Sequence, residues 1–135
     1  MPAERSLVLD PDAAIAFAAS GRPVPEGVKL LAPALLRSQV LSRLHESVSS
    51  GVLDEKEARR LFGAVNELPM RLLGDRVLRL EAWKMATDLG WRETYRAEYV
   101  ALTVLWGDAL VTSDAELIAA VDGVIPIAPL SDLLE

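Results

Sequence analysis

The sequence predicts an α/β fold in which a short parallel sheet carries helices on both of its faces. Three observations favour this class. Short apolar runs alternate with segments of helical periodicity along the chain, and two of those runs end just before an acid, Asp10 and Asp114. The composition, 51% hydrophobic and 25% charged over 135 residues, is typical of a packed core. We therefore expect one domain over residues 1–135, without a linker or an internal repeat.

The first elements follow from local signals. An apolar run at 7–9 predicts a strand, and the turn-forming Asp10-Pro11-Asp12 leads into an alanine-rich helix that reaches residue 19. A loop over 21–27 precedes a second strand at 29–32. Pro33 suits the first position of the next helix, which we expect to end near residue 50.

The alternation continues to the end of the chain. Acids and threonine in capping positions set the helix starts, and glycine or proline sets the ends. In order, the expected elements are a helix begun by Asp54 and ended by Pro69, a possible strand at 70–73, a helix from Asp75 to 89 followed by Gly90, a helix from Thr94 to Gly107, a strand at 109–112, a helix from Asp114 to 121, a strand at 124–127 placed at a sheet edge by Pro126, and a short tail at 130–135.

Composition excludes several kinds of chemistry. The absence of cysteine removes thiol catalysis and thiolate metal sites, and His45 is the one histidine, so a Ser/His/Asp triad has little support. No glycine-rich phosphate loop is present. The net charge of −6 argues against a broad nucleic-acid-binding surface. The N-terminus lacks an export pattern and no apolar run is long enough for a membrane span, so we expect a cytoplasmic protein.

The acids that follow strands are the first candidates for function. Ligands of parallel sheets bind outside the carboxyl ends of the strands, which is where Asp10 and Asp114 should lie. Aspartate in this position is also a favourable helix N-cap. Each acid alone is explained by capping, whereas the pair leaves capping and function equally open.

One predicted helix carries polar residues where apolar ones are expected. Gln39 falls between Leu35 and Leu36 on the helical wheel, inside the apolar arc, and Arg43 lies one turn later. A buried polar group needs a partner. The two residues either face a polar crevice or lie at the core edge, with the Arg43 guanidinium reaching water. His45 lies on the opposite side and is expected at the surface.

Four segments together resemble the PIN-domain ribonucleases, and most closely the VapC-type toxins of bacterial toxin–antitoxin pairs. The resemblance covers almost the whole chain in the right order. It rests on Leu7-Val8-Leu9-Asp10, Ala32-Pro33-Ala34-Leu35-Leu36-Arg37-Ser38-Gln39-Val40-Leu41, Thr94-Tyr95-Arg96-Ala97-Glu98-Tyr99-Val100-Ala101-Leu102 and Leu110-Val111-Thr112-Ser113-Asp114.

The resemblance implies a site that holds Mg²⁺ or Mn²⁺ with acids and cuts RNA with a metal-activated water. Asp10 matches the first acid and Asp114 the acid after the fourth strand, so both are expected as catalytic residues and metal ligands. Gln39 stands where the family carries Glu, and Arg96 stands where it carries Asp. The Arg96 guanidinium is expected to pair with the remaining carboxylates in place of a cation.

Three further residues are candidate auxiliaries of this site: Asp12, Glu93 and Thr112. Asp12 and Glu93 are conceivable replacements for the missing acids, although turn and helix-start roles explain them as well. Glu98 lies about 200° around the helix from Arg96 and is expected to point elsewhere.

Three functions remain open. The first is a VapC-like endoribonuclease with a weakened acidic site, and the second is a catalytically silent PIN-like module that binds RNA or a protein. The third is a small phosphohydrolase similar to the haloacid dehalogenases, in which Asp10 would be the nucleophile and Asp12 the acid/base. The VapC resemblance also implies a homodimer and a VapB-like antitoxin. The helices at 54–68 and 75–89 are expected to cover the sheet and are candidates for pairing with a partner.

Overall fold

The structure is a computed structural model that describes residues 4–134. Its elements confirm the predicted alternation of strands and helices. In chain order they are β1 (Arg5–Leu9), α1 (Pro11–Ser20), β2 (Val28–Pro33), α2 (Leu36–Ser49), α3 (Glu55–Glu67), β3 (Met70–Leu73), α4 (Arg76–Leu89), α5 (Tyr95–Leu105), β4 (Ala109–Val111), α6 (Ala115–Ala120), β5 (Ile127–Ala128) and the 3-10 helix η1 (Leu130–Leu133).

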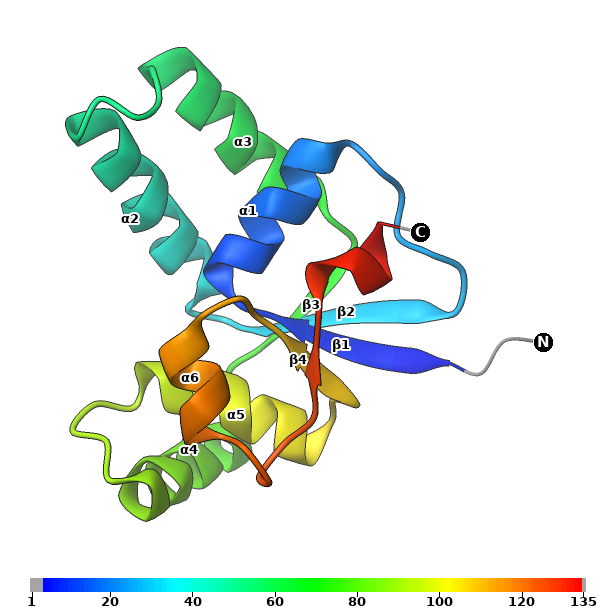
Figure 1. Cartoon of the computed structure of the whole chain (residues 1–135), viewed down its shortest axis with the longest axis vertical. Helices are drawn as coiled ribbons and strands as arrows, with labels where there is room; N and C mark the ends of the chain where they lie inside the picture. Colours follow the sequence, from blue (N-terminus) through cyan, green and yellow to red (C-terminus); the bar gives the residue numbers. More distant parts are fainter. Residues whose placement is uncertain (1–3, 135) are drawn as a thin grey trace.

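The five strands form one sheet in the order β3-β2-β1-β4-β5, and every neighbouring pair is parallel. Figure 1 shows α1, α2 and α3 on one side of the sheet and α4, α5 and α6 on the other. Because both faces are covered, the second half of the central strand is apolar: Leu7, Val8 and Leu9 are fully buried. The fold is therefore the three-layer α/β architecture that the sequence predicts.

The strand order indicates where a ligand crevice lies in the sheet. The chain builds outward from β1 through β2 to β3, and then returns to the other side of β1 to form β4. Such a reversal leaves the loops after the two adjacent strands diverging, which opens a crevice at their carboxyl ends. β1 and β4 run in register to Leu9 and Val111, so the residues that follow these two positions lie at the same edge of the sheet.

Predicted helix caps account for most boundaries. Asp10, Asp54, Asp75 and Asp114 each accept a backbone N–H from the first turn of the helix that follows. Gly90 ends α4 with φ 72°, a left-handed conformation that glycine adopts without strain. Thr94 lies at the N-terminus of α5 as predicted, but its side chain makes no capping hydrogen bond.

Pro33 is not the start of a helix, which corrects the sequence prediction. It is the last residue of β2 and lies opposite Leu73 of β3, whereas β1 pairs with β2 only as far as Leu31. The missing N–H of Pro33 therefore costs no ladder bond with β1, and α2 begins three residues later, at Leu36.

The end of the chain also differs from the prediction. The strand expected at 124–127 is the two-residue β5 at 127–128, because the amides of Val124 and Ile125 turn back to the Val121 carbonyl. β5 is an edge strand, as Pro126 indicated. The predicted tail contains η1, which packs against α1 and buries Leu133. Its last residue, Glu135, lies outside the described residues.

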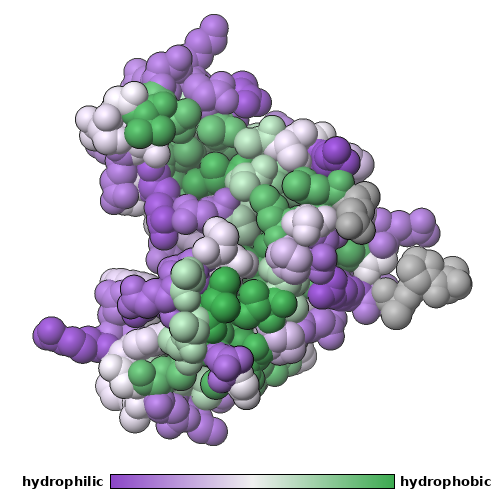
Figure 2. Space-filling view, in the orientation of Figure 1, coloured by the Kyte–Doolittle hydropathy of each residue, from purple (hydrophilic) through white to green (hydrophobic). Residues whose placement is uncertain are grey.

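Within residues 4–134, no helix is long and apolar enough to cross a membrane. Figure 2 shows that the surface is hollowed between the α2–α3 part of the molecule and the α4–α6 part, and that hydrophilic side chains gather in this hollow.

Candidate functional site

Asp10 is the most buried acid of the crevice. It follows β1 directly, is 8% exposed, and its Oδ1 accepts the Ala13 amide at 2.8 Å. The extended backbone at Asp10 lets the carboxylate fold back over the first turn of α1, with Pro11 at the first helical position. The capping role that the sequence suggested for Asp10 is confirmed.

Burial raises the pKa of Asp10 above its ordinary value, because a carboxylate loses hydration in the protein interior. The hydroxyl of Thr112 and the amide of Ala13 act in the opposite direction, and they are weaker than the burial effect. Asp12 adds a small upward shift and Arg43 a small downward one. The protein therefore stabilises the Asp10 anion less well than water does.

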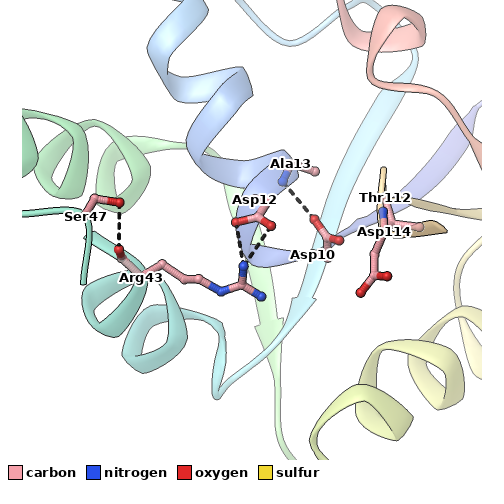
Figure 3. A network of polar contacts seen from close by, with 7 residues as sticks. All are labelled: Asp10, Asp12, Ala13, Arg43, Ser47, Thr112 and Asp114. Carbon is pink, nitrogen blue, oxygen red and sulfur yellow. Dashed lines mark hydrogen bonds and ion pairs between the residues drawn. The ribbon is translucent and has the colours of Figure 1, made fainter. Parts of the chain in front are cut away.

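Thr112 and Asp114 come from the adjacent strand end. The Thr112 hydroxyl accepts the Asp114 amide at 3.1 Å, which leaves its own proton free to donate to Asp10. Asp114 is exposed, and its Oδ1 accepts the amides of Glu116 and Leu117 at 3.0 and 3.1 Å. Figure 3 shows Asp10, Thr112 and Asp114 grouped at the edge of the sheet. The structure thus brings together the two acids that the resemblance assigned to catalysis.

Asp12 points to the other side of Asp10 and is engaged by a cation. Arg43 Nη1 donates to both carboxylate oxygens, at 3.0 and 2.8 Å, as Figure 3 shows. Both side chains are about half exposed, so water and salt weaken the pair. A carboxylate held by a guanidinium is a poor replacement for a missing metal ligand, and it is equally unsuited to the acid/base role of a phosphohydrolase.

The side chain of Gln39, which the sequence places among apolar residues, is hydrogen-bonded to Tyr99. Its Oε1 accepts the hydroxyl of Tyr99 at 2.6 Å, across the sheet edge from α5 to α2. Tyr99 is 3% exposed, and burial raises its pKa, with smaller upward contributions from Asp10 and Glu98, so the phenol stays protonated and acts as a donor. One lone pair of the Gln39 oxygen is therefore already used within the protein.

Arg96 is held away from the two acids. Its guanidinium lies over the Trp91 ring, 4.5 Å from the centroid, and its Nη1 lies 3.8 Å from Glu116 Oε1. The expected pairing with Asp10 and Asp114 is not found among the described residues, and this corrects the sequence prediction. The positive charge of Arg96 therefore lies beside Trp91 and Glu116, at the first turns of α5 and α6.

The two remaining glutamates lie on the α5 side of the molecule. Glu93 is exposed in the connection before α5. Glu98 is half-buried, which raises its pKa, while Arg79 acts in the opposite direction. This surrounding agrees with the expectation that Glu98 points away from Arg96. Within residues 4–134, no three histidine or acidic side chains come together in a way that could hold a metal ion.

Sequence reasoning missed two features of the site. It did not identify Tyr99 as the partner of Gln39, although a hydroxyl on the apolar face of a facing helix was the signal to look for. It also left the partner of Arg43 open, because the packing of α1 against α2 that brings Asp12 within reach is a tertiary property.

The fold and the paired acids at the β1 and β4 ends define a PIN-like α/β domain, and solved structures agree. The crystal structure of PAE2754 from Pyrobaculum aerophilum matches with a TM-score of 0.70 and 26% identity, over 98% of this chain and 93% of that one. A 2.2 Å structure of VapBC-1 from nontypeable Haemophilus influenzae matches with a TM-score of 0.61 and 12% identity, over 93% of this chain and 98% of that one. No protein-family model and no curated protein matches the chain.

Proposed function

We propose that the chain is a VapC-like protein of the metal-dependent endoribonuclease lineage that has lost its metal site and acts by binding a partner. One observation carries the proposal: within residues 4–134, no third acid joins Asp10 and Asp114 in a group that could hold a metal ion. The Gln39 amide binds the Tyr99 hydroxyl, and the Asp12 carboxylate is paired with Arg43.

Charge explains why this set does not fit Mg²⁺ or Mn²⁺. Both ions prefer several oxygen ligands, with carboxylates supplying the opposing charge. Asp10 and Asp114 are the two acids left, and burial disfavours the anion of Asp10. Arg43 brings a positive charge close enough to act on Asp10, which repels a divalent cation. A protein with this site is suited to binding rather than to metal-activated hydrolysis.

A VapB-like antitoxin is the partner that we propose for the hollow. The structural neighbour VapBC-1 supports this choice. The resemblance to the VapC-type toxins implies an antitoxin whose tail enters the groove. In this chain hydrophilic side chains gather in the hollow, as Figure 2 shows. An acidic or amide-rich tail would complement these side chains through ion pairs and hydrogen bonds.

We also propose a homodimer that uses α4. Val77, Leu80 and Trp83 follow one another at helical spacing and are 57%, 60% and 71% exposed. Large apolar residues that stay exposed on one side of a helix are typical of a protein–protein contact. Sedimentation of the natural chain and of Leu80→Glu tests this: a dimer that becomes a monomer supports the contact, and a natural monomer contradicts it.

Cleavage of RNA tests the loss of catalysis. The purified protein is compared in Mg²⁺, in Mn²⁺ and in chelator, alongside Asp10→Asn and the double reversion Gln39→Glu/Arg96→Asp. We expect no metal-dependent cutting by the natural chain. Metal-dependent cutting that Asp10→Asn abolishes would contradict the proposal.

A weakly active Mg²⁺- or Mn²⁺-dependent endoribonuclease is the second candidate. It is favoured by the retention of Asp10, Thr112 and Asp114 at adjoining strand ends (Figure 3). In that case Asp10 and Asp114 would hold the ion and Thr112 would orient Asp10. The same assay distinguishes the candidates, because this one requires cutting that depends on metal and on both acids.

A further inference from the structure

A second cavity, of about 560 Å³, lies on the sheet apart from the candidate site. It opens over β2 and β3, beside the end of α5, and it is lined by neither Gln39 nor any acid of the candidate site. Its lining is mostly apolar, and it also carries two cations, a hydroxyl, a carboxylate and an indole. The residues that matter here are Ser6, Lys29, Arg71 and Trp106.

The strand register explains why these side chains share one face. Ser6 lies opposite Lys29, and Leu31 lies opposite Arg71. Lys29 and Leu31 are two residues apart on β2 and share a face, so the side chains of Ser6, Lys29 and Arg71 point to the same side of the sheet. Lys29 and Arg71 are diagonal neighbours on adjacent strands, with Cα atoms about 8 Å apart from the strand spacing and the rise per residue. Two long cationic side chains at this separation can reach a single anion.

The two cations are available for a ligand. Lys29 has one ion pair, with Glu4 at 3.3 Å, and both partners are more than 60% exposed, so the pair is weak. Arg71 has no ion pair among residues 4–134. The one acid in the lining, Asp75, already accepts the Leu78 amide at 2.9 Å as the cap of α4.

Trp106 supplies an aromatic surface at the same cavity. It caps the C-terminus of α5, and 61% of the residue is exposed, although it is the largest side-chain type. The chain turns sharply at the next residue, Gly107, where a Cβ would come within 2.7 Å of Val8 Cγ2. This close approach to β1 fixes the backbone that carries the indole at the cavity wall.

We propose that this cavity binds a 5′-phosphorylated nucleoside, either as a free nucleotide or as the end of an RNA strand. Lys29 and Arg71 bind the phosphate, since arginine matches phosphate oxygens with paired donors and lysine adds a point charge. The base stacks on Trp106, as bases do on exposed aromatic side chains. The volume lies within the range of small-ligand pockets. The proposal is independent of the fate of the acid site.

Binding of adenosine monophosphate to the ¹⁵N-labelled chain tests the proposal, with the Trp106 indole N–H as the reporter. The signal is assigned with Trp106→Leu, and adenosine and inorganic phosphate are titrated separately. We expect the monophosphate to shift the Trp106 signal and to bind at least about tenfold more tightly than adenosine. Lys29→Gln/Arg71→Gln should weaken that binding at least about tenfold, to the level of adenosine.

Matched variants separate this site from general effects. Lys56→Gln and Arg59→Gln remove an exposed lysine and an exposed arginine elsewhere, and both should leave the affinity unchanged. A 5′-phosphorylated oligoadenylate that binds more tightly than the mononucleotide, through the same residues, identifies an RNA end as the ligand. Tighter binding of the mononucleotide identifies the free nucleotide.

Two results would overturn the proposal. The first is an unchanged Trp106 signal at millimolar concentrations of both the mononucleotide and the oligonucleotide. The second is an affinity that Lys29→Gln/Arg71→Gln leaves unaltered in a folded protein. An equal response to a short polyglutamate peptide would also contradict it, because the cavity would then recognise charge without a base.

Discussion

The two halves of the crevice differ in what holds their residues in place. In the strand-end half, Asp10 and Asp114 each cap a helix while they face the crevice. In the helix half, Gln39 and Arg96 sit on α2 and α5, and their backbones need no particular side chain there. Capping therefore gives Asp10 and Asp114 a structural role that favours an acid, whereas no helix start requires an acid at positions 39 and 96.

Capping alone can retain an acid at the end of β1 or β4, so the presence of Asp10 and Asp114 is weak support for catalysis. The helix half is more informative about catalysis, because only chemistry would require acids at Gln39 and Arg96.

Truncating Tyr99 should have the largest effect, because this residue joins the helix half to the core. Tyr99→Ala removes a buried aromatic ring and should lower the free energy of unfolding by about 3–5 kcal/mol. Tyr99→Phe keeps the ring and loses only the hydrogen bond to Gln39, which should cost about 1 kcal/mol. Chemical denaturation measures both, and equal losses would show that the ring is not packed as described.

Asp10→Ala should lower the free energy of unfolding by about 0.5–2 kcal/mol, because α1 loses its N-cap. Asp10→Asn is the matched control, since asparagine caps as well as aspartate and removes the buried charge. At neutral pH we expect Asp10→Asn to be at least as stable as the natural chain. A loss with Asp10→Asn equal to that with Asp10→Ala would contradict the capping role.

The stability contribution of Asp10 should depend on pH with a defined sign. Its folded pKa is raised above its ordinary value, so the unfolded state loses its proton first as pH rises. The favourable contribution is present in full below the ordinary value of 3.8 and is lost as pH rises through the folded pKa. The difference in unfolding free energy between the natural chain and Asp10→Asn, measured from acid to neutral pH, should shift in favour of Asp10→Asn. A shift in the opposite direction would contradict the burial effect.

Asp114→Ala should have a smaller effect, about 0.5–1 kcal/mol, because this cap is exposed and water can replace it. Thermal unfolding measures the change, and Asp114→Asn serves as the control that keeps a capping side chain. A larger loss for Asp114 than for Asp10 would reverse the order of burial of the two acids.

Arg96→Gln should change stability least, by about 0.5 kcal/mol, since it removes an indole contact and one long ion pair at a partly exposed position. Arg92→Gln, at an exposed position in the connection before α5, controls for the loss of charge. A loss well above that of Asp10→Ala would mean that Arg96 has a structural task and would break the distinction between the two halves.

The fold could be predicted because its signals are local. The strand over 7–9, the caps at Asp54 and Asp75 and the glycine after α4 are each decided by a few neighbouring residues, and the structure confirms them. The predicted roles of Pro33 and of residues 124–127 were wrong, because the end of a strand depends on which residues of the neighbouring strand pair with it. Proline at the end of β2 is tolerated only because β1 stops pairing before it.

The site was predictable in its strand-end half and less so in its helix half. Asp10 and Asp114 were found from their place after apolar strands, which is a sequence property. The hydrogen bond from Tyr99 to Gln39 and the pairing of Arg43 with Asp12 join segments 60 and 31 residues apart. Such contacts depend on how helices cross, and helix periodicity gives only the face that each residue occupies.

Calorimetric titration with Mn²⁺ tests directly whether the helix half has lost the metal site while the strand-end half keeps its acids. The natural chain, Gln39→Glu/Arg96→Asp and the same double variant with Asp10→Asn are compared. We predict no stoichiometric binding by the natural chain at micromolar Mn²⁺, one equivalent bound by the double reversion, and loss of that binding when Asp10→Asn is added. One equivalent bound by the natural chain with micromolar affinity would contradict the account.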